Sequence, residues 1–340
     1  MLETRTSPGA QLAPFGILQQ IATAFWLSRS LHAIADLGVA DVLGDDPMSA
    51  AQLAAATGSH PEALHRVLRL IASQHIFSRT DDDRWTHTPA SRLLRTDHPQ
   101  SVRSYVRMLG LPPMWRSAGA LDQAVKTGKP VGNDVVEGGF WNYFAQHPEA
   151  NTIFNEAMRG KALSQVSAVV ERYDFSKFAR IADIGGGHGH VIRAIVNANR
   201  GVHGVLFDQP HVVEQAREIA SDRLTLQGGN FFTDEMPVAD AYIVMEVIHD
   251  WGDAESETIL RAIRRAAPAR AKLLLIEGLI PDDPGPNWIK TLDVMMLDVL
   301  GGSQRTYPEY ESLLARCGFS LQRKIDIGMD YWILEATVQG

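Results

Sequence analysis

The sequence contains one cysteine, Cys317, in 340 residues. A single cysteine cannot form a disulfide within the chain, and it cannot supply the several thiolates of a Cys-based zinc site. Long apolar runs are also missing, since none reaches the roughly 18 residues that a membrane-spanning helix requires. The first residues lack the basic-then-apolar order of a signal peptide. We therefore expect a cytoplasmic protein, in a reducing compartment, with no membrane partner.

Basic residues are outnumbered in this chain. It has 32 Lys and Arg against 40 Asp and Glu, a net charge of −8. Proteins that bind nucleic acid usually carry a basic surface, so the balance weighs against DNA or RNA as the main partner. The hydrophobic fraction of 45% is that of a folded protein, and the length is enough for two domains at about 150 residues each.

Residues 1–110 have the pattern of a winged helix. Helical spacing is present over residues 21–37 and 61–73, Ser49 and Gln52 form a capping box, and two short strands flank the acidic turn at 81–83. Such a unit either binds DNA, as in a regulator that senses a small molecule, or serves packing and dimerisation. The helix over 61–73, which would contact the DNA, carries only two Lys or Arg residues, Arg66 and Arg69. The charge pattern therefore favours dimerisation.

Residues 111–168 are predicted to be a helical connector rich in aromatic residues and Met. A different pattern of apolar residues begins at residue 169. From there to residue 340 short apolar strands, one of them at 241–247, alternate with helices, one of them at 212–220. This alternation predicts a parallel sheet with helices on both faces. Two strand-like segments at 319–327 and 331–338 end the chain, and they predict an antiparallel hairpin that closes the sheet.

A glycine-rich loop joins the first of these strands to its helix. The loop reads Asp-Ile-Gly-Gly-Gly-His-Gly-His over residues 183–190. The dinucleotide pattern G-x-G-x-x-G fails here, because position 190 is His190 rather than glycine. Asp183, just before the loop, would suit a cationic sulfonium or amino group. Asp208 ends the next strand, where a carboxylate can bind both ribose hydroxyls, although a solvated turn is the alternative.

Several motifs in order resemble the caffeate/isoflavone-type O-methyltransferases and their bacterial natural-product relatives. They are the glycine loop, Phe-Asp-Gln-Pro-His-Val at 207–212, Gly-Asn-Phe-Phe at 229–232, Val-Ile-His-Asp-Trp at 247–251 and Gly-Gly-Ser-Gln-Arg-Thr at 301–306. The resemblance implies an α/β, Rossmann-like class I methyltransferase sheet with a closing antiparallel hairpin. It also implies an N-terminal winged-helix domain that forms a homodimer.

The same resemblance implies S-adenosylmethionine as the cofactor, with S-adenosylhomocysteine as its product. Asp208 would bind the ribose, and Asn230 and Phe231 would flank the adenine. Asn230 stands where the family usually has Asp, and its amide can still hydrogen-bond to the adenine amino group. The full set of expected cofactor residues is Asp183, Gly185, Gly187, Asp208, Gln209, Asn230 and Phe231.

His249 is the candidate catalytic base, because it follows a strand at the edge where ligands bind in open α/β sheets. Asp250, its neighbour in the chain, is expected to point away from it. The resemblance implies instead that Glu277 orients His249 and that Gln304 lies at a second position, where plant members have Glu. Gln304 cannot stabilise an imidazolium by charge. Some enzymes with this fold bind the cofactor without methylating and instead catalyse hydroxylation or pericyclic chemistry. A non-methylating hydroxylase or pericyclase, with S-adenosylmethionine as a structural or electrostatic cofactor, is the alternative function.

The resemblance also implies an acceptor pocket with walls of Met and aromatic side chains, which suit a flat ring. Ordinary core packing is the alternative for each of these residues. No cluster of His, Asp and Glu has the spacing of metal ligands, so we expect no metal. The predicted function is methylation of an aromatic hydroxyl of a small secondary metabolite. The candidate acceptor residues are Trp141, Met158, Met295, Met296 and Leu300.

Overall fold

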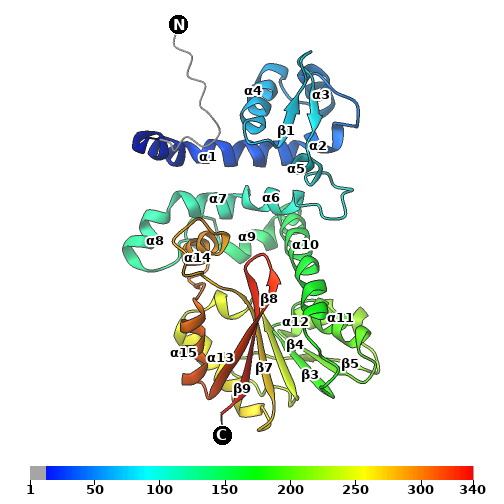
Figure 1. Ribbon diagram of the computed structural model, residues 1–340, viewed down its shortest axis with the longest axis vertical. Coiled ribbons are helices and arrows are strands. Elements are labelled where there is room, and N and C mark those ends of the chain that lie inside the picture. The colour runs from blue at the N-terminus through cyan, green and yellow to red at the C-terminus, as the bar shows by residue number, and fades with distance from the viewer. Residues whose placement is uncertain (1–12, 340) are drawn as a thin grey trace. The chain divides into compact units, whose positions relative to one another are not determined.

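A computed structural model describes residues 13–339 of the chain (Figure 1). The chain divides into two compact units. One contains residues 13–111 together with Glu149–Gly160, and the other contains Pro112–Pro148 together with residues 161–339. The long helix α10 (Pro148–Arg172) contributes residues to both units.

The first unit has the predicted winged-helix order of elements. The long first helix ends at Gly38, whose left-handed φ of 68° suits glycine. The predicted capping box is confirmed, because Ser49 and Gln52 exchange hydrogen bonds between side chain and backbone. The elements are α1 (Pro14–Leu37), α2 (Val39–Val42), α3 (Ala50–Thr57), α4 (Pro61–Ala72), β1 (Phe77–Arg79), β2 (Trp85–His87), α5 (Pro89–Arg92) and α6 (Arg103–Leu109).

The second unit is built on a seven-stranded sheet with the order β5-β4-β3-β6-β7-β9-β8. Strands β3, β4, β5, β6 and β7 are parallel to one another, and β9 pairs antiparallel with both β7 and β8. The predicted parallel sheet and closing hairpin are therefore confirmed. The strands are β3 (Arg180–Ile184), β4 (His203–Asp208), β5 (Leu224–Gly228), β6 (Ala241–Met245), β7 (Lys272–Gly278), β8 (Phe319–Gly328) and β9 (Tyr331–Val338).

Two elements of the second unit end earlier than the sequence predicts. The helix expected over 212–220 is α12 (Pro210–Gln215) followed by the 3-10 turn η1 (Arg217–Ile219). The strand expected to reach residue 247 ends at Met245, because Glu246 takes a positive φ of 52° that ends the extended backbone. The other helices are α7 (Pro112–Gly119), α8 (Leu121–Thr127), α9 (Phe140–Gln146), α11 (His190–Ala198), α13 (Asp253–Ala266), α14 (Trp288–Val299) and α15 (Tyr307–Arg316).

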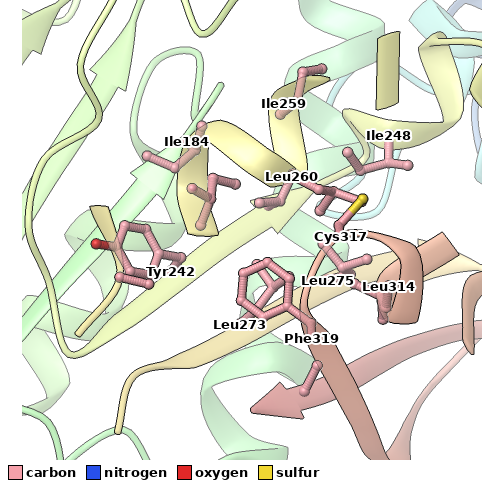
Figure 2. Close-up of a cluster of buried hydrophobic side chains, with 14 of the residues drawn as sticks. Ile184, Tyr242, Ile248, Ile259, Leu260, Leu273, Leu275, Leu314, Cys317 and Phe319 are labelled. Atoms are coloured by element: carbon pink, nitrogen blue, oxygen red, sulfur yellow. The ribbon is translucent and has the colours of Figure 1, made fainter. Parts of the chain in front are cut away.

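Apolar side chains fill both faces of the sheet. Figure 2 shows part of one face, where Leu273 and Leu275 of β7 pack with Leu260 of α13 and Leu314 of α15, and all four are fully buried. Each such side chain contributes about 1.5–3 kcal/mol on burial. This packing fixes the strand ends, from which the site residues project. Within residues 13–339, no helix has the length and apolar character to cross a membrane.

Candidate functional site

The glycine loop lies between β3 and α11, at the carboxyl end of the sheet. Gly185 and Gly187 take φ values of 69° and 58°, a backbone conformation that favours glycine. An added Cβ at Gly186 would lie 2.5 Å from the carboxylate carbon of Asp183. A Cβ at Gly187 would meet no atom within 4 Å. The loop backbone therefore packs closely against Asp183 on one side and leaves open space on the other.

Asp183 is a buried carboxylate with unused hydrogen-bonding capacity. It is 1% exposed, and its Oδ2 atom has no hydrogen-bond partner among the described residues. Burial, together with the negative charge of Asp208, raises the pKa of Asp183 to about 7. A positive charge at the loop would lower that pKa and restore the carboxylate, which is the response expected of a cation-binding group.

Asp208 lies at the end of β4 and is tied to the loop. Its Oδ2 accepts a hydrogen bond from the Gly187 amide at 2.8 Å, and its Oδ1 accepts one from the Gln209 amide at 2.6 Å. A carboxylate accepts about four hydrogen bonds, so Asp208 retains capacity for the two hydroxyls of a ribose.

Asn230 and Phe231 follow β5 in the next loop. The Asn230 Oδ1 atom accepts from the Phe232 backbone amide at 2.9 Å, and the Asn230 backbone N–H donates to Asp234 Oδ2 at 2.8 Å. The first of these bonds uses the side-chain oxygen of Asn230 within its own turn. Phe231 makes an edge-to-face contact with Trp251, with ring centroids 5.9 Å apart.

His249 lies on the 3-10 turn η2 (Ile248–Asp250) after β6, and Glu277 lies in β7 beside it. His249 Nδ1 is 3.0 Å from Glu277 Oε2, an ion-pair distance at which the two atoms are not aligned as a hydrogen bond. The other carboxylate oxygen, Oε1, accepts from the Ile248 amide at 3.0 Å. The structure thus brings the predicted base and its predicted orienting acid together.

The charge on His249 depends on two carboxylates. Burial works to lower its pKa, but the negative charge of Glu277 and the contact with Asp250 outweigh burial and raise the pKa to about 10. Asp250 was expected to point away, and this expectation is wrong. His249 Nε2 is 3.3 Å from Asp250 Oδ1, because the tight 3-10 turn folds the two neighbouring side chains toward each other.

The segment 302–305 clamps the turn that carries His249. The Ser303 amide donates to the His249 carbonyl at 2.9 Å, and a Cβ added at Gly302 would lie 2.0 Å from that same carbonyl oxygen. Arg305, 4% exposed, donates to the carbonyls of Ile248 and Trp251 at 3.3 and 3.0 Å. Arg305 lies within one of the quoted motifs but was not among the predicted site residues.

Gln304 lies near the end of β7. Its backbone amide donates to Asp293 at 2.8 Å, and a Cβ at Gly278 would be 3.4 Å from its Oε1 atom. The side chain is 3% exposed, and neither of its amide atoms has a hydrogen-bond partner among the described residues. No hydrogen bond between Gln304 and His249 is found in that part of the chain.

The candidate acceptor residues are distributed over both units. Met158 belongs to the first unit, where it packs against the buried cluster around Met108 and Ile153. The other four belong to the second unit. Trp141 on α9 is 59% exposed, Met296 on α14 is buried, and Met295 and Leu300 are half-buried beside it.

A further ion pair lies at the end of β6. Glu246, in its strained positive-φ conformation, pairs with Lys161 of α10. The negative charge of Glu246 is mostly compensated there, since Lys161 and His249 hold its pKa below the usual range despite burial. Sequence reasoning missed this pair, because nothing in the local pattern joins residues 161 and 246.

Comparison with known proteins shows the family to which the chain belongs. Residues 119–320 match an O-methyltransferase domain and residues 19–97 match an O-methyltransferase dimerisation domain. This chain belongs to the O-methyltransferase family. A phenazine O-methyltransferase of Lysobacter antibioticus is 39% identical over 325 residues, covering 94% of this chain and 95% of that protein. Family membership confirms the Rossmann-like class I fold predicted from the motifs.

Two further relatives extend the comparison. A phenazine-1-carboxylate N-methyltransferase of Pseudomonas aeruginosa is 31% identical over 336 residues, covering 96% of this chain and 98% of that protein. The solved structure of a methyltransferase in calicheamicin biosynthesis, in its S-adenosylhomocysteine-bound form, has a TM-score of 0.87 and 29% identity. It covers 97% of this chain and all of that one.

The chain is an S-adenosylmethionine-dependent methyltransferase, and its own residues fit that cofactor. The unpartnered carboxylate oxygen of Asp183 suits the cofactor's positive charge, and Asp208 at the strand end suits its ribose. The open side of Gly187 leaves the backbone accessible to a ligand.

Proposed function

We propose that this methyltransferase methylates an aromatic hydroxyl of a small secondary metabolite, with His249 as the general base. The observation that carries the proposal is the contact between His249 and the fully buried Glu277 at the ends of β6 and β7. These are central strands of the sheet, and the glycine loop follows the adjacent strand β3. The base and the cofactor residues therefore share one edge.

The chemistry of a phenol calls for such a base. A phenol has a pKa near 10 and is mostly neutral at pH 7, so it is a poor nucleophile. Nε2 of His249 removes the hydroxyl proton as the oxygen attacks, and positioned proton transfer of this kind contributes about 10²–10⁴-fold to rate. Bound S-adenosylmethionine supplies the methyl group. Glu277 stabilises the imidazolium that results.

The remaining roles follow the division of the chain that the motifs predict. Residues 169–340 bind the cofactor, and residues 111–168 contribute to the acceptor pocket. Trp141, Met295, Met296 and Leu300, all in the second unit, are proposed as its lining. Residues 1–110 form a homodimer, a role supported by the match to a dimerisation domain.

The exposed side of α1 supports dimerisation too. Phe15, Leu18, Ile21, Phe25 and Trp26 lie on one helix and are each 49–76% exposed. Large apolar side chains gathered on one helix mark a protein interaction surface more often than a solvated one.

The test is transfer of a labelled methyl group. Purified protein is incubated with methyl-labelled S-adenosylmethionine and matched acceptors: hydroxylated phenazines and hydroxybenzoates, the same rings with the hydroxyl blocked, and their amino counterparts. We expect label on the hydroxylated rings alone. Label on the amino rings alone would assign N-methylation instead.

His249→Gln and a control, His203→Gln, complete the experiment. His203 is an exposed histidine at the start of β4. We expect turnover to fall at least about 10²-fold in His249→Gln, with the cofactor Kd unchanged, and to stay normal in the control. Normal turnover in His249→Gln would remove His249 from the mechanism.

A further inference from the structure

His249 is held between two carboxylates that differ in their access to water. Glu277 Oε2 lies 3.0 Å from Nδ1 and its side chain is 0% exposed. Asp250 Oδ1 lies 3.3 Å from Nε2 and its side chain is 39% exposed. Of these two carboxylates, Asp250 is thus the one that joins the buried imidazole to solvent.

The nitrogen that Asp250 contacts is the one that a base needs. Nδ1 faces Glu277, so an acceptor hydroxyl must approach Nε2. A carboxylate beside Nε2 favours a proton on that atom, because a carboxylate accepts hydrogen bonds and cannot donate one. The same contact helps to raise the pKa of His249 to about 10, so at neutral pH the resting imidazole carries both protons. In that state Nε2 cannot accept another.

We propose that Asp250 is a positioning residue that holds Nε2 of His249 between turnovers and carries the Nε2 proton out to water. This inference rests on the proposed role of His249 as the base. To prepare the base, the Nε2–H bond breaks and an O–H bond forms on Asp250. The exposed Asp250 side chain turns to solvent and releases the proton to water.

The acceptor hydroxyl then takes the place that Asp250 has left. Its O–H bond breaks, the electron pair stays on oxygen, and the proton forms a new Nε2–H bond. When product leaves, Asp250 returns to Nε2 and the cycle restarts. One proton reaches the solvent in each turnover, which balances the proton that the hydroxyl loses.

The other charged or titratable groups around His249 do not give the Nε2 proton a path to water. Glu277 is enclosed by the sheet and already accepts from the Ile248 amide. Glu246, at the end of β6, is paired with Lys161. From the segment before α15, Arg305 donates to backbone carbonyls of the η2 region, and the Tyr310 hydroxyl of α15 is buried.

The experiment is an NMR titration of histidine-labelled full-length protein, with no acceptor present. His249→Gln identifies the signal of His249 by its loss. We expect the pKa of His249 to fall by at least one pH unit in Asp250→Asn, a tenfold or greater gain in neutral imidazole at a given pH. Asp250→Glu, which keeps the charge, should titrate like the wild type.

Asp282→Asn is the matched control. It removes the same charge from an exposed residue after β7 and should leave the titration of His249 unchanged. An unchanged pKa of His249 in Asp250→Asn would overturn the proposal. If that variant does not fold, Asp250→Ser is the second neutral variant and is judged by the same criterion.

Kinetics with a working acceptor separate this role from a structural one. Since the hydroxyl no longer displaces a carboxylate, both the KM for the acceptor and kcat should fall in Asp250→Asn, and the acid limb of the kcat/KM profile should move to lower pH. A higher KM at unchanged kcat would overturn the proposal, because it would mean that Asp250 binds the acceptor. Full turnover in His249→Gln would instead refute the proposed function and leave the titration result standing.

Discussion

The charge on His249 makes the stability of the fold depend on pH, and the size of that dependence can be worked out from the structure. Burial lowers its pKa, but Glu277 and Asp250 outweigh burial and raise the pKa from 6.5 to about 10. Each pH unit of difference between the folded and unfolded pKa corresponds to about 1.4 kcal/mol. The protonated imidazole therefore stabilises the folded state by on the order of 5 kcal/mol.

The direction follows from the raised pKa. Below pH 6.5 the imidazole is protonated in both states, and the stabilisation is complete. Between pH 6.5 and about 10 the folded state retains a proton that the unfolded chain has lost. The stabilisation is therefore lost progressively across this range.

The assay is urea unfolding of the wild type and His249→Gln at several pH values from 6 to 10. Titrating groups away from this turn are common to the two proteins, so the difference in free energy of unfolding reports on His249 together with its contacts to Glu277 and Asp250. That difference should fall by about 1.4 kcal/mol per pH unit between pH 7 and 9.5. A flat difference would refute the reasoning, since it would mean that His249 titrates alike in the folded and unfolded states.

Other predictions concern the cofactor, the turn and the interface. Asp208→Asn should raise the Kd for S-adenosylmethionine about 10- to 100-fold, which is the loss expected for hydrogen bonds to a charged group. The control Asp222→Asn, at an exposed position, should leave that Kd unchanged. Calorimetry measures the Kd of both variants. Gly302→Ala places a Cβ 2.0 Å from the backbone carbonyl oxygen of His249, the proposed base. This variant should lower turnover at least about 10²-fold. The control Gly119→Ala, where an added Cβ meets no atom within 4 Å, should leave turnover unchanged. Trp26→Asp, on the exposed face of α1, should shift the protein toward monomer in light scattering, and an unchanged mass would locate the interface elsewhere.

The sequence was sufficient for the order of elements and for most of the strands. Alternating apolar runs and glycine turns are local signals, so β3, β4, β5 and the closing hairpin could be predicted. Asp183 and Asp208 lie at the ends of their strands and His249 follows one, all in one parallel sheet. The carboxyl ends of such strands meet at one edge. Their proximity is thus a consequence of topology.

The contacts that depend on long-range packing could not be predicted. Lys161 and Glu246 are 85 residues apart in the chain, and their pairing depends on how α10 packs against the end of β6. The position of Gln304 also depends on long-range packing. Its side chain is buried near Gly278 because the backbone amide is held by Asp293.

Asp250 shows why adjacency in sequence misleads. In an extended strand, neighbouring side chains point to opposite faces, and on that basis Asp250 should point away from His249. The chain leaves β6 at Met245 and has formed a 3-10 turn by Ile248, so the alternation no longer applies. The strained Glu246 between them makes this change of direction. The early end of β6 therefore accounts for the contact at Nε2, and any substitution that extended this strand should separate Asp250 from the imidazole.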